Sequence, residues 1–220
     1  MLAEIPVHRP DSLDEALALL AAPPQEEELT VLAGGTDLMV LLNARSSVPQ
    51  RVLDIWKLDA LRGIRMLDDG RLEVGALSTY CELIASSLVQ GHSPALVEAS
   101  KTVGAVQIQA RGTLGGNGAN ASPAGDTLPV LLAQGAEVVL VSRGGGERSV
   151  DFASFYKGYR QPDIREGELI QYFRIDPLPV GGISSFRKVG TRLAQAISKV
   201  MIAGVGVLDG QGRVAELRLA

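Results

Sequence analysis

Two segments rich in small residues carry the clearest chemical signal in this chain. The first is Ala33-Gly-Gly-Thr-Asp37, and the second runs from Gly112 to Leu132 and begins Gly-Thr-Leu-Gly-Gly-Asn. Glycine has no β-carbon, so such runs let the backbone approach another group closely. Each segment leads into a predicted helix, whose first turn offers free backbone N–H groups and a partial positive charge to phosphate. Together, the two segments predict a clamp around a pyrophosphate.

Neither segment matches a common nucleotide-binding motif. The P-loop pattern Gly-Xaa4-Gly-Lys-Ser/Thr is absent, and Gly112–Asn117 does not fit the Gly-Xaa-Gly-Xaa-Xaa-Gly fingerprint, so a Rossmann domain is disfavoured. Tight turns with good caps are the alternative for either segment alone, although the second is longer than a turn requires. Asp126, late in the second segment, stands where the N-cap of a helix is expected.

The remaining residue types argue against several kinds of chemistry. A single cysteine, Cys81, excludes an intramolecular disulfide and a cysteine-ligated iron–sulfur or zinc site within the chain. With only two histidines, no metal site is expected, and no Ser/His/Asp set or close carboxylate pair predicts hydrolysis. A net charge of −4 lacks the positive footprint of a nucleic-acid-binding protein. We therefore expect cofactor-binding residues and no catalytic side chain.

The first glycine segment belongs to a small α/β lobe predicted over residues 1–57. Ser12 and Glu15 form a capping-box pattern at the start of an amphipathic helix. A short buried strand precedes the glycines, an apolar helix follows them, and a second strand closes the lobe. The predicted ranges are 13–21 for the first helix, 29–32 for the first strand, 38–43 for the second helix and 51–55 for the second strand.

The second segment belongs to a larger lobe predicted over residues 58–220. Alternating residues around an Asp69-Gly70 turn predict a hairpin over 64–76. A second capping box, Thr79 with Glu82, opens a helix that we expect to continue to about Leu88, and a further helix is predicted near 94–103. The other predicted strands cover 137–142, the segment ending at 150, 168–175, 183–189, 196–208 and 214–219.

No segment predicts export or a membrane anchor. The N-terminal residues have neither a basic region nor an apolar run, and the apolar run 200–208 is too short to span a bilayer. We therefore expect a cytoplasmic protein without a membrane span.

The two glycine segments, together with Ala121-Ser-Pro-Ala-Gly-Asp126, resemble the FAD-binding subunit of the molybdenum hydroxylases. This is the family of xanthine dehydrogenase and the aerobic carbon monoxide dehydrogenases, and the similarity covers almost the whole chain. The resemblance implies an α+β, two-lobed FAD-binding fold of the para-cresol methylhydroxylase and vanillyl-alcohol oxidase type. The family's C-terminal α/β domain, which normally follows near the end of this chain, is expected to be missing.

The resemblance also implies the residues that hold FAD. On one side, the pyrophosphate and adjoining ribose would be wrapped by Val31, Leu32, Ala33, Gly34, Gly35, Thr36, Asp37 and Leu38. On the other side they would meet Thr113, Gly116 and Asn117, while Asp126 would accept hydrogen bonds from flavin or ribityl hydroxyls. The isoalloxazine would lie near Ile170, Lys188 and Tyr159. A solvated Lys188 and a loop-anchoring Tyr159 are the alternatives for those two.

The implied activity is electron transfer, because the flavin supplies the redox chemistry and the protein binds and orients it. In the family, a molybdopterin subunit hydroxylates the substrate. Electrons then pass through an iron–sulfur subunit to FAD, and on to NAD or another acceptor. Two alternatives stay open: a self-sufficient flavin oxidoreductase, such as an enolpyruvyl-sugar reductase, and a non-catalytic nucleotide-binding module. The sequence does not name the substrate.

Overall fold

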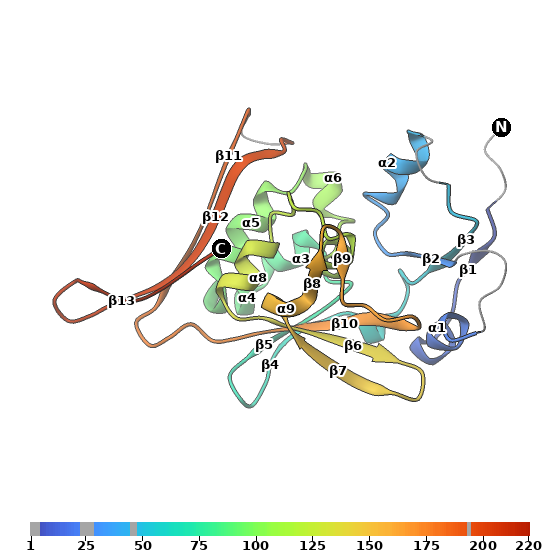
Figure 1. Cartoon of the computed structure of the whole chain (residues 1–220), viewed down its shortest axis with the longest axis horizontal. Coiled ribbons are helices and arrows are strands. Elements are labelled where there is room, and N and C mark those ends of the chain that lie inside the picture. Colours follow the sequence, from blue (N-terminus) through green and yellow to red (C-terminus); the bar gives the residue numbers. More distant parts are fainter. Residues whose placement is uncertain (1–4, 23–28, 45–47, 193–194) are drawn as a thin grey trace.

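A computed structural model describes residues 5–22, 29–44, 48–192 and 195–220 (Figure 1). Its helices are α1 Leu13–Leu20, α2 Leu38–Asn43, the 3-10 helix η1 Asp59–Leu61, α3 Tyr80–Ala85, α4 Ser87–His92, α5 Pro94–Thr102, α6 Val106–Gln109, α7 Leu114–Asn120, α8 Leu128–Ala133 and α9 Phe152–Phe155. Its strands are β1 Val7–His8, β2 Leu29–Leu32, β3 Arg51–Asp54, β4 Ile64–Met66, β5 Leu72–Gly75, β6 Glu137–Ser142, β7 Gly146–Asp151, β8 Tyr156–Gly158, β9 Gln161–Pro162, β10 Glu168–Ile175, β11 Ile183–Gly190, β12 Ser198–Leu208 and β13 Val214–Leu219.

A small parallel sheet, in the order β1-β3-β2, forms the N-terminal part of the molecule with α1 and α2. Ser12 caps α1 by accepting from the Glu15 backbone N–H at 3.2 Å, as its pattern predicts. Leu17 and Leu53 are buried in a core that also takes in Leu169 from β10, which belongs to the larger sheet. The predicted order of helix, strand, glycine segment, helix and strand is confirmed, and β1 is an additional strand.

A five-stranded antiparallel sheet, in the order β4-β5-β10-β6-β7, forms the floor beneath the central helices (Figure 1). The predicted hairpin is present as β4 and β5, and Gly70 at its turn has a φ of +84°, which glycine adopts without strain. Strand β10 inserts between β5 and β6, although a long stretch of chain separates it from both. Phe173 and Leu140 are fully buried beneath the helices.

The helix predicted from Thr79 to about Leu88 is in fact two helices. Thr79 and Glu82 form the complete capping box at the start of α3, but the chain turns extended at Ser86. Ser86 then caps α4 by accepting from the Val89 N–H at 3.4 Å. Serine competes with helical backbone for hydrogen bonds in this way, which explains the break.

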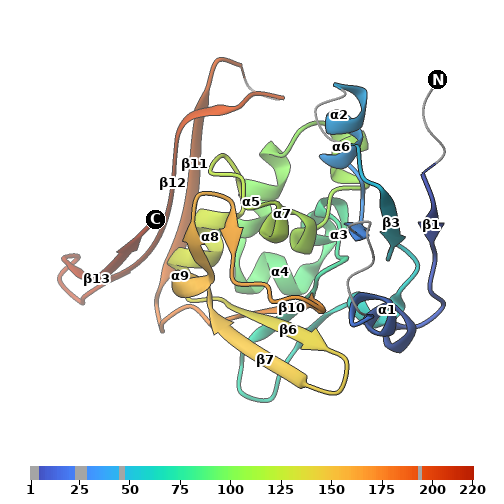
Figure 2. The same cartoon turned by 45° about the vertical axis from the view of Figure 1, so that its right-hand side comes forward.

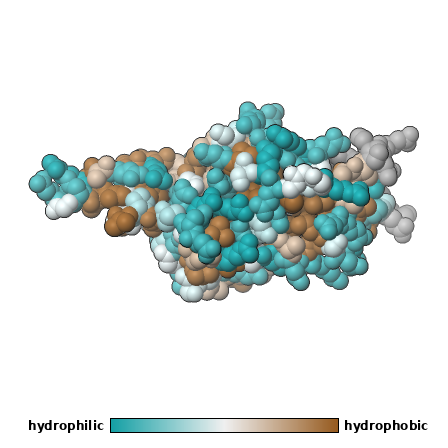
Figure 3. Space-filling model, turned by 90° about the horizontal axis from the view of Figure 1, so that it is seen from below, coloured by the Kyte–Doolittle hydropathy of each residue, from teal (hydrophilic) through white to brown (hydrophobic). Residues whose placement is uncertain are grey.

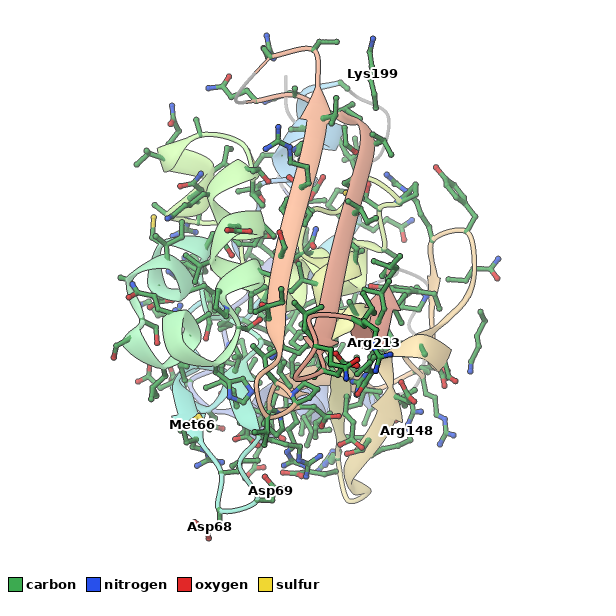
Figure 4. The ribbon with its side chains drawn as sticks, turned by 90° about the vertical axis from the view of Figure 1, so that its left-hand side faces the viewer. Met66, Asp68, Asp69, Arg148, Lys199 and Arg213 are labelled. Atoms are coloured by element: carbon green, nitrogen blue, oxygen red, sulfur yellow. The ribbon has the colours of Figure 1, made fainter. Side chains whose placement is uncertain are left out.

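A third sheet, β11-β12-β13, packs its inner face on α5 and α8, so that the helices lie between it and the small parallel sheet (Figures 1 and 2). Figure 4 views its outer face, with Lys199 near one end and Arg213 near the other. Strand β13 belongs to an arm that projects from the molecule and carries apolar side chains on its surface (Figure 3). Leu217 and Leu219 of β13 are exposed. No helix in the described part of the chain is long and apolar enough to cross a membrane.

Candidate cofactor-binding site

A cavity of about 500 Å³ lies between the small parallel sheet and the central helices. Its volume and largely apolar wall suit a cofactor or other small molecule. It brings together the whole predicted segment from Val31 to Leu38 with Thr113, Gly116, Asn117 and Ile170. Gly112, Gly115, Ala119 and Asn120 of the second glycine segment also line it. The remaining lining residues were not singled out from the sequence: Leu41, Ile55, Ala76, Leu77, Tyr80, Val103, Ile108, Ile164, Glu168 and Leu169.

The first glycine segment bends the chain between β2 and α2 at the edge of this cavity. Gly35 has a φ of +78°, a left-handed conformation that favours glycine. Gly34 lies against the opposite wall, because a β-carbon built on it would stand 1.7 Å from the carbonyl oxygen of Arg111. No side chain fits at this position, so Gly34 sets how closely the two walls approach.

The backbone of this segment keeps its hydrogen-bond donors free. The carbonyls of Gly35 and Asp37 accept hydrogen bonds from α2. Within the described residues, however, the N–H groups from Gly34 to Leu38 donate no hydrogen bond. Adjacent free N–H groups at a bend before a helix form a cradle for an anion. This segment therefore has the donors that a phosphate requires.

The second glycine segment differs from its prediction. Its first half is not a bare loop but helix α7, and the N–H groups of its first turn already have partners. Leu114 donates to Ser78 O at 3.0 Å, Gly115 to Ala76 O at 2.8 Å and Gly116 to the capping Thr113 Oγ1 at 3.0 Å. The expected free donors of a helix N-terminus are thus absent from the first turn of α7. The free backbone donors are therefore concentrated on the first segment.

The glycines of α7 serve packing and the cavity wall. A β-carbon on Gly115 would stand 2.6 Å from the Ala76 β-carbon, and one on Gly118 would stand 2.9 Å from Phe173 Cζ. These two glycines let α7 lie directly on the sheet. A β-carbon on Gly116 would meet only the capping Thr113 Oγ1, at 2.8 Å. Gly115 and Gly116 line the cavity, whereas Gly118 does not.

Trp56 joins the two walls beside Gly34. Two guanidinium groups lie over its ring, with Arg111 Cζ 3.7 Å and Arg62 Cζ 4.6 Å from the ring centroid. Arg62 also donates to the Trp56 carbonyl oxygen at 2.7 Å. These two cation–π contacts fix the end of the small parallel sheet against the residues that precede α7. A lone tryptophan between charged residues gives no sequence signal for this arrangement.

Comparison with known proteins shows the family of the chain. The family described as the FAD binding domain in molybdopterin dehydrogenase matches residues 3–178. The chain belongs to this family. The resemblance read from the glycine segments is confirmed, and FAD is the family's cofactor.

Several family members are similar along most of this chain. The xanthine dehydrogenase FAD-binding subunit of Escherichia coli O157:H7 is 34% identical over 214 residues, covering 97% of this chain and 72% of that protein. Caffeine dehydrogenase subunit beta of a Pseudomonas strain is 38% identical over 198 residues, covering 88% and 66%. The fold matches carbon monoxide dehydrogenase of Hydrogenophaga pseudoflava with a TM-score of 0.91 and 29% identity, covering all of this chain and 75% of that one. The chain thus spans about two thirds to three quarters of these relatives' lengths.

Three residues that the resemblance implied for FAD binding lie outside the cavity wall. Asp126 does not cap α8, whose N-cap is Thr127; instead its Oδ2 accepts from Lys188 Nζ at 2.7 Å. Both side chains of this pair are nearly buried, and burial raises the pKa of Asp126 against the opposing effect of Lys188. The N-cap prediction for Asp126 is therefore wrong, since its carboxylate pairs with the Lys188 ammonium instead. Tyr159, at the turn between β8 and β9, is 75% exposed.

Glu168 forms the cavity edge on β10 and gives a pH-dependent prediction. Its carboxylate accepts from Arg148 on β7 at 2.6 Å, and this bond lowers the pKa of Glu168. Arg148 is labelled in Figure 4. A lowered folded-state pKa adds stability that is present above the unfolded value and lost as pH falls through the folded one. We expect Glu168→Gln to lower the free energy of unfolding by about 1 kcal/mol at neutral pH, with the deficit closing below about pH 4.

Urea unfolding at a series of pH values measures this effect. Glu166→Gln is the control, because Glu166 is exposed and two positions away. A constant deficit for Glu168→Gln from neutral to acid pH would contradict the prediction.

Proposed function

We propose that this chain is the FAD-binding subunit of a molybdenum-containing dehydrogenase that carries electrons from iron–sulfur clusters to NAD or another acceptor. The observation that supports it most directly is the cradle of free N–H groups from Gly34 to Leu38 at the mouth of the cavity in a chain of this family. Bound FAD supplies the electron transfer. No feature of the described residues favours a self-sufficient oxidoreductase or a non-catalytic module over this function.

The residues present fit a dinucleotide. The free N–H groups would receive the diphosphate, and Gly116 on the opposite wall leaves room for it. Ile55, Ile108 and Ile170 offer apolar surface to flat ring systems and exclude water from them. In the whole protein, the chain's own task is to hold and orient the cofactor.

Three further contacts belong to this proposal. Asp126 Oδ1 is buried and has no hydrogen-bond partner among the described residues, so it would accept from a flavin or ribityl hydroxyl. Lys188 would stand near the isoalloxazine, and Tyr159 would cover the flavin face, where NAD could approach. Residues 1–57 and 58–220 would act as two lobes around an extended flavin, in a fold of the para-cresol methylhydroxylase and vanillyl-alcohol oxidase type.

The names of the relatives support a multi-subunit assembly. They include a "subunit beta", an "FAD-subunit" and two "medium chain" proteins of carbon monoxide dehydrogenases. We propose an iron–sulfur subunit and a molybdopterin subunit as partners, with substrate recognition in the latter. The chain has no role in binding nucleic acid under this proposal.

Titration of the purified chain with FAD tests the proposal. Trp56 is the only tryptophan, so flavin binding at the adjacent cavity is expected to quench its fluorescence as flavin absorption bands appear in the protein fraction. A reduced iron–sulfur partner should then bleach these bands, and NADH should do so if NAD is the acceptor. A protein that stays colourless at high FAD concentration would contradict the proposal.

A further inference from the structure

Tyr80 opens helix α3 directly after the capping Thr79 and forms part of the cavity wall. Its side chain is 3% exposed and packs edge-on against the backbone at Gly112, where an added β-carbon would stand 2.8 Å from Tyr80 Cε2. Thr79 and the close contact with Gly112 therefore fix the ring in place. The hydroxyl is the only polar atom that this side chain brings to the cavity.

This hydroxyl has no hydrogen-bond partner among the described residues, and, unlike Asp126 Oδ1, it is not enclosed by the surrounding atoms, so it opens onto the cavity that Tyr80 lines. A tyrosine hydroxyl in a largely apolar wall normally has a partner, and one that opens onto a cavity can take its partner from a bound ligand. The carboxylates of Asp37, on the small parallel-sheet side, and Asp126, on the helical side, both act on the phenol electrostatically. Burial is the main cause that raises the pKa of Tyr80, and the raised pKa keeps the hydroxyl protonated as a donor.

Tyr156 shows what a structural tyrosine looks like in the same molecule. It too is largely buried, but its hydroxyl donates to the Gly118 carbonyl oxygen at 2.9 Å. That bond ties β8 to α7, and Tyr156 does not line the cavity. Of these two tyrosines, the one facing the cavity is therefore the one without a partner.

We propose that the Tyr80 hydroxyl is a cofactor-binding donor that gives its hydrogen bond to an oxygen of the dinucleotide held in the cavity. The inference rests on the proposed function, since it names FAD as the ligand. Phosphate, ribityl and isoalloxazine oxygens all accept hydrogen bonds, and a donor fixed by packing loses little entropy on binding them. Tyr80 thereby adds a donor on the helical wall, where the first turn of α7 has none free.

The test compares Tyr80→Phe with Tyr156→Phe in the full chain. Each replacement keeps the ring and removes one hydroxyl. Flavin titration gives the Kd for FAD, and thermal unfolding without FAD gives the Tm of the apoprotein. For Tyr80→Phe we expect FAD affinity to fall about tenfold and the apoprotein Tm to stay level or rise, since an unpartnered hydroxyl is lost. For Tyr156→Phe we expect the reverse: a lower apoprotein Tm and an unchanged Kd.

Two results would overturn the inference. One is a Tyr80→Phe protein that binds FAD as tightly as the wild type, and the other is a loss of apoprotein Tm in Tyr80→Phe equal to that in Tyr156→Phe. A wild-type chain that binds no FAD would contradict the proposed function together with this inference. Tight wild-type binding with an unaffected Tyr80→Phe variant would contradict the inference alone.

Discussion

Replacing Gly34 with alanine is expected to abolish retention of FAD while the protein stays folded. The added β-carbon would stand 1.7 Å from Arg111 O and 2.6 Å from Arg111 C, and backbone atoms cannot yield as a flexible side chain would. The first glycine segment must then withdraw from the opposite wall. Overpacking of this kind costs about 3 kcal/mol. Because that strain is relieved by opening the cavity, FAD affinity should fall about a hundredfold.

The measurement is the ratio of flavin to protein after gel filtration, with circular dichroism to follow the fold. Gly91→Ala is the matched control, because a β-carbon on Gly91 in α4 would meet nothing within 4 Å. It should keep its FAD and gain up to about 1 kcal/mol of stability from alanine's higher helix propensity. Equal flavin content in Gly34→Ala and the wild type would show that this contact does not shape the site.

Replacing Lys188 with methionine is expected to give the largest loss of stability. Lys188 Nζ lies 2.7 Å from Asp126 Oδ2, and the side chains are 12% and 7% exposed. Removing one partner of a buried pair leaves the other charge without compensation, which costs about 3–5 kcal/mol. For a chain of this size the Tm should fall by about 10 °C.

The loss should depend on pH in a defined direction. Burial raises the pKa of Asp126, and Lys188 opposes that rise, so the variant should carry a carboxyl with a still higher folded-state pKa. A raised folded-state pKa favours the protonated folded form, and its stabilising effect is fully present below the unfolded value and lost as pH rises through the folded one. The deficit of Lys188→Met should therefore shrink as the solution is acidified.

Two variants serve as controls for the buried pair. The double variant Asp126→Asn with Lys188→Met removes both charges and should recover most of the stability. Arg213, labelled in Figure 4, forms a surface ion pair with Asp209, and the two side chains are 71% and 31% exposed. Arg213→Met breaks this pair and should change the Tm little. Equal Tm losses in Arg213→Met and Lys188→Met would contradict the assigned role of the buried pair.

Local sequence signals determined many elements and one wall of the site. The capping residues Ser12 and Thr79 start helices where their patterns predict, and Asp69-Gly70 marks the hairpin turn. These signals depend on residues that are close together in the sequence, so they predict local structure without knowledge of the fold. The segment Ala33–Asp37 also lies at the cavity. Its free N–H groups arise locally, because a bend before a helix leaves backbone donors without partners.

Only the tertiary structure decided which glycines and which polar groups face the cavity. The sequence shows Gly115, Gly116 and Gly118 as one run, but Gly115 and Gly118 pack on Ala76 and Phe173, and only Gly115 and Gly116 line the cavity. The sequence cannot show that the first N–H groups of α7 donate to carbonyls distant in the chain. Nor can it show that Asp126 pairs with Lys188 instead of capping α8. A hydrogen bond has one donor and needs a partner within about 3 Å, and that distance is set by how β5, β10 and β11 place remote parts of the chain.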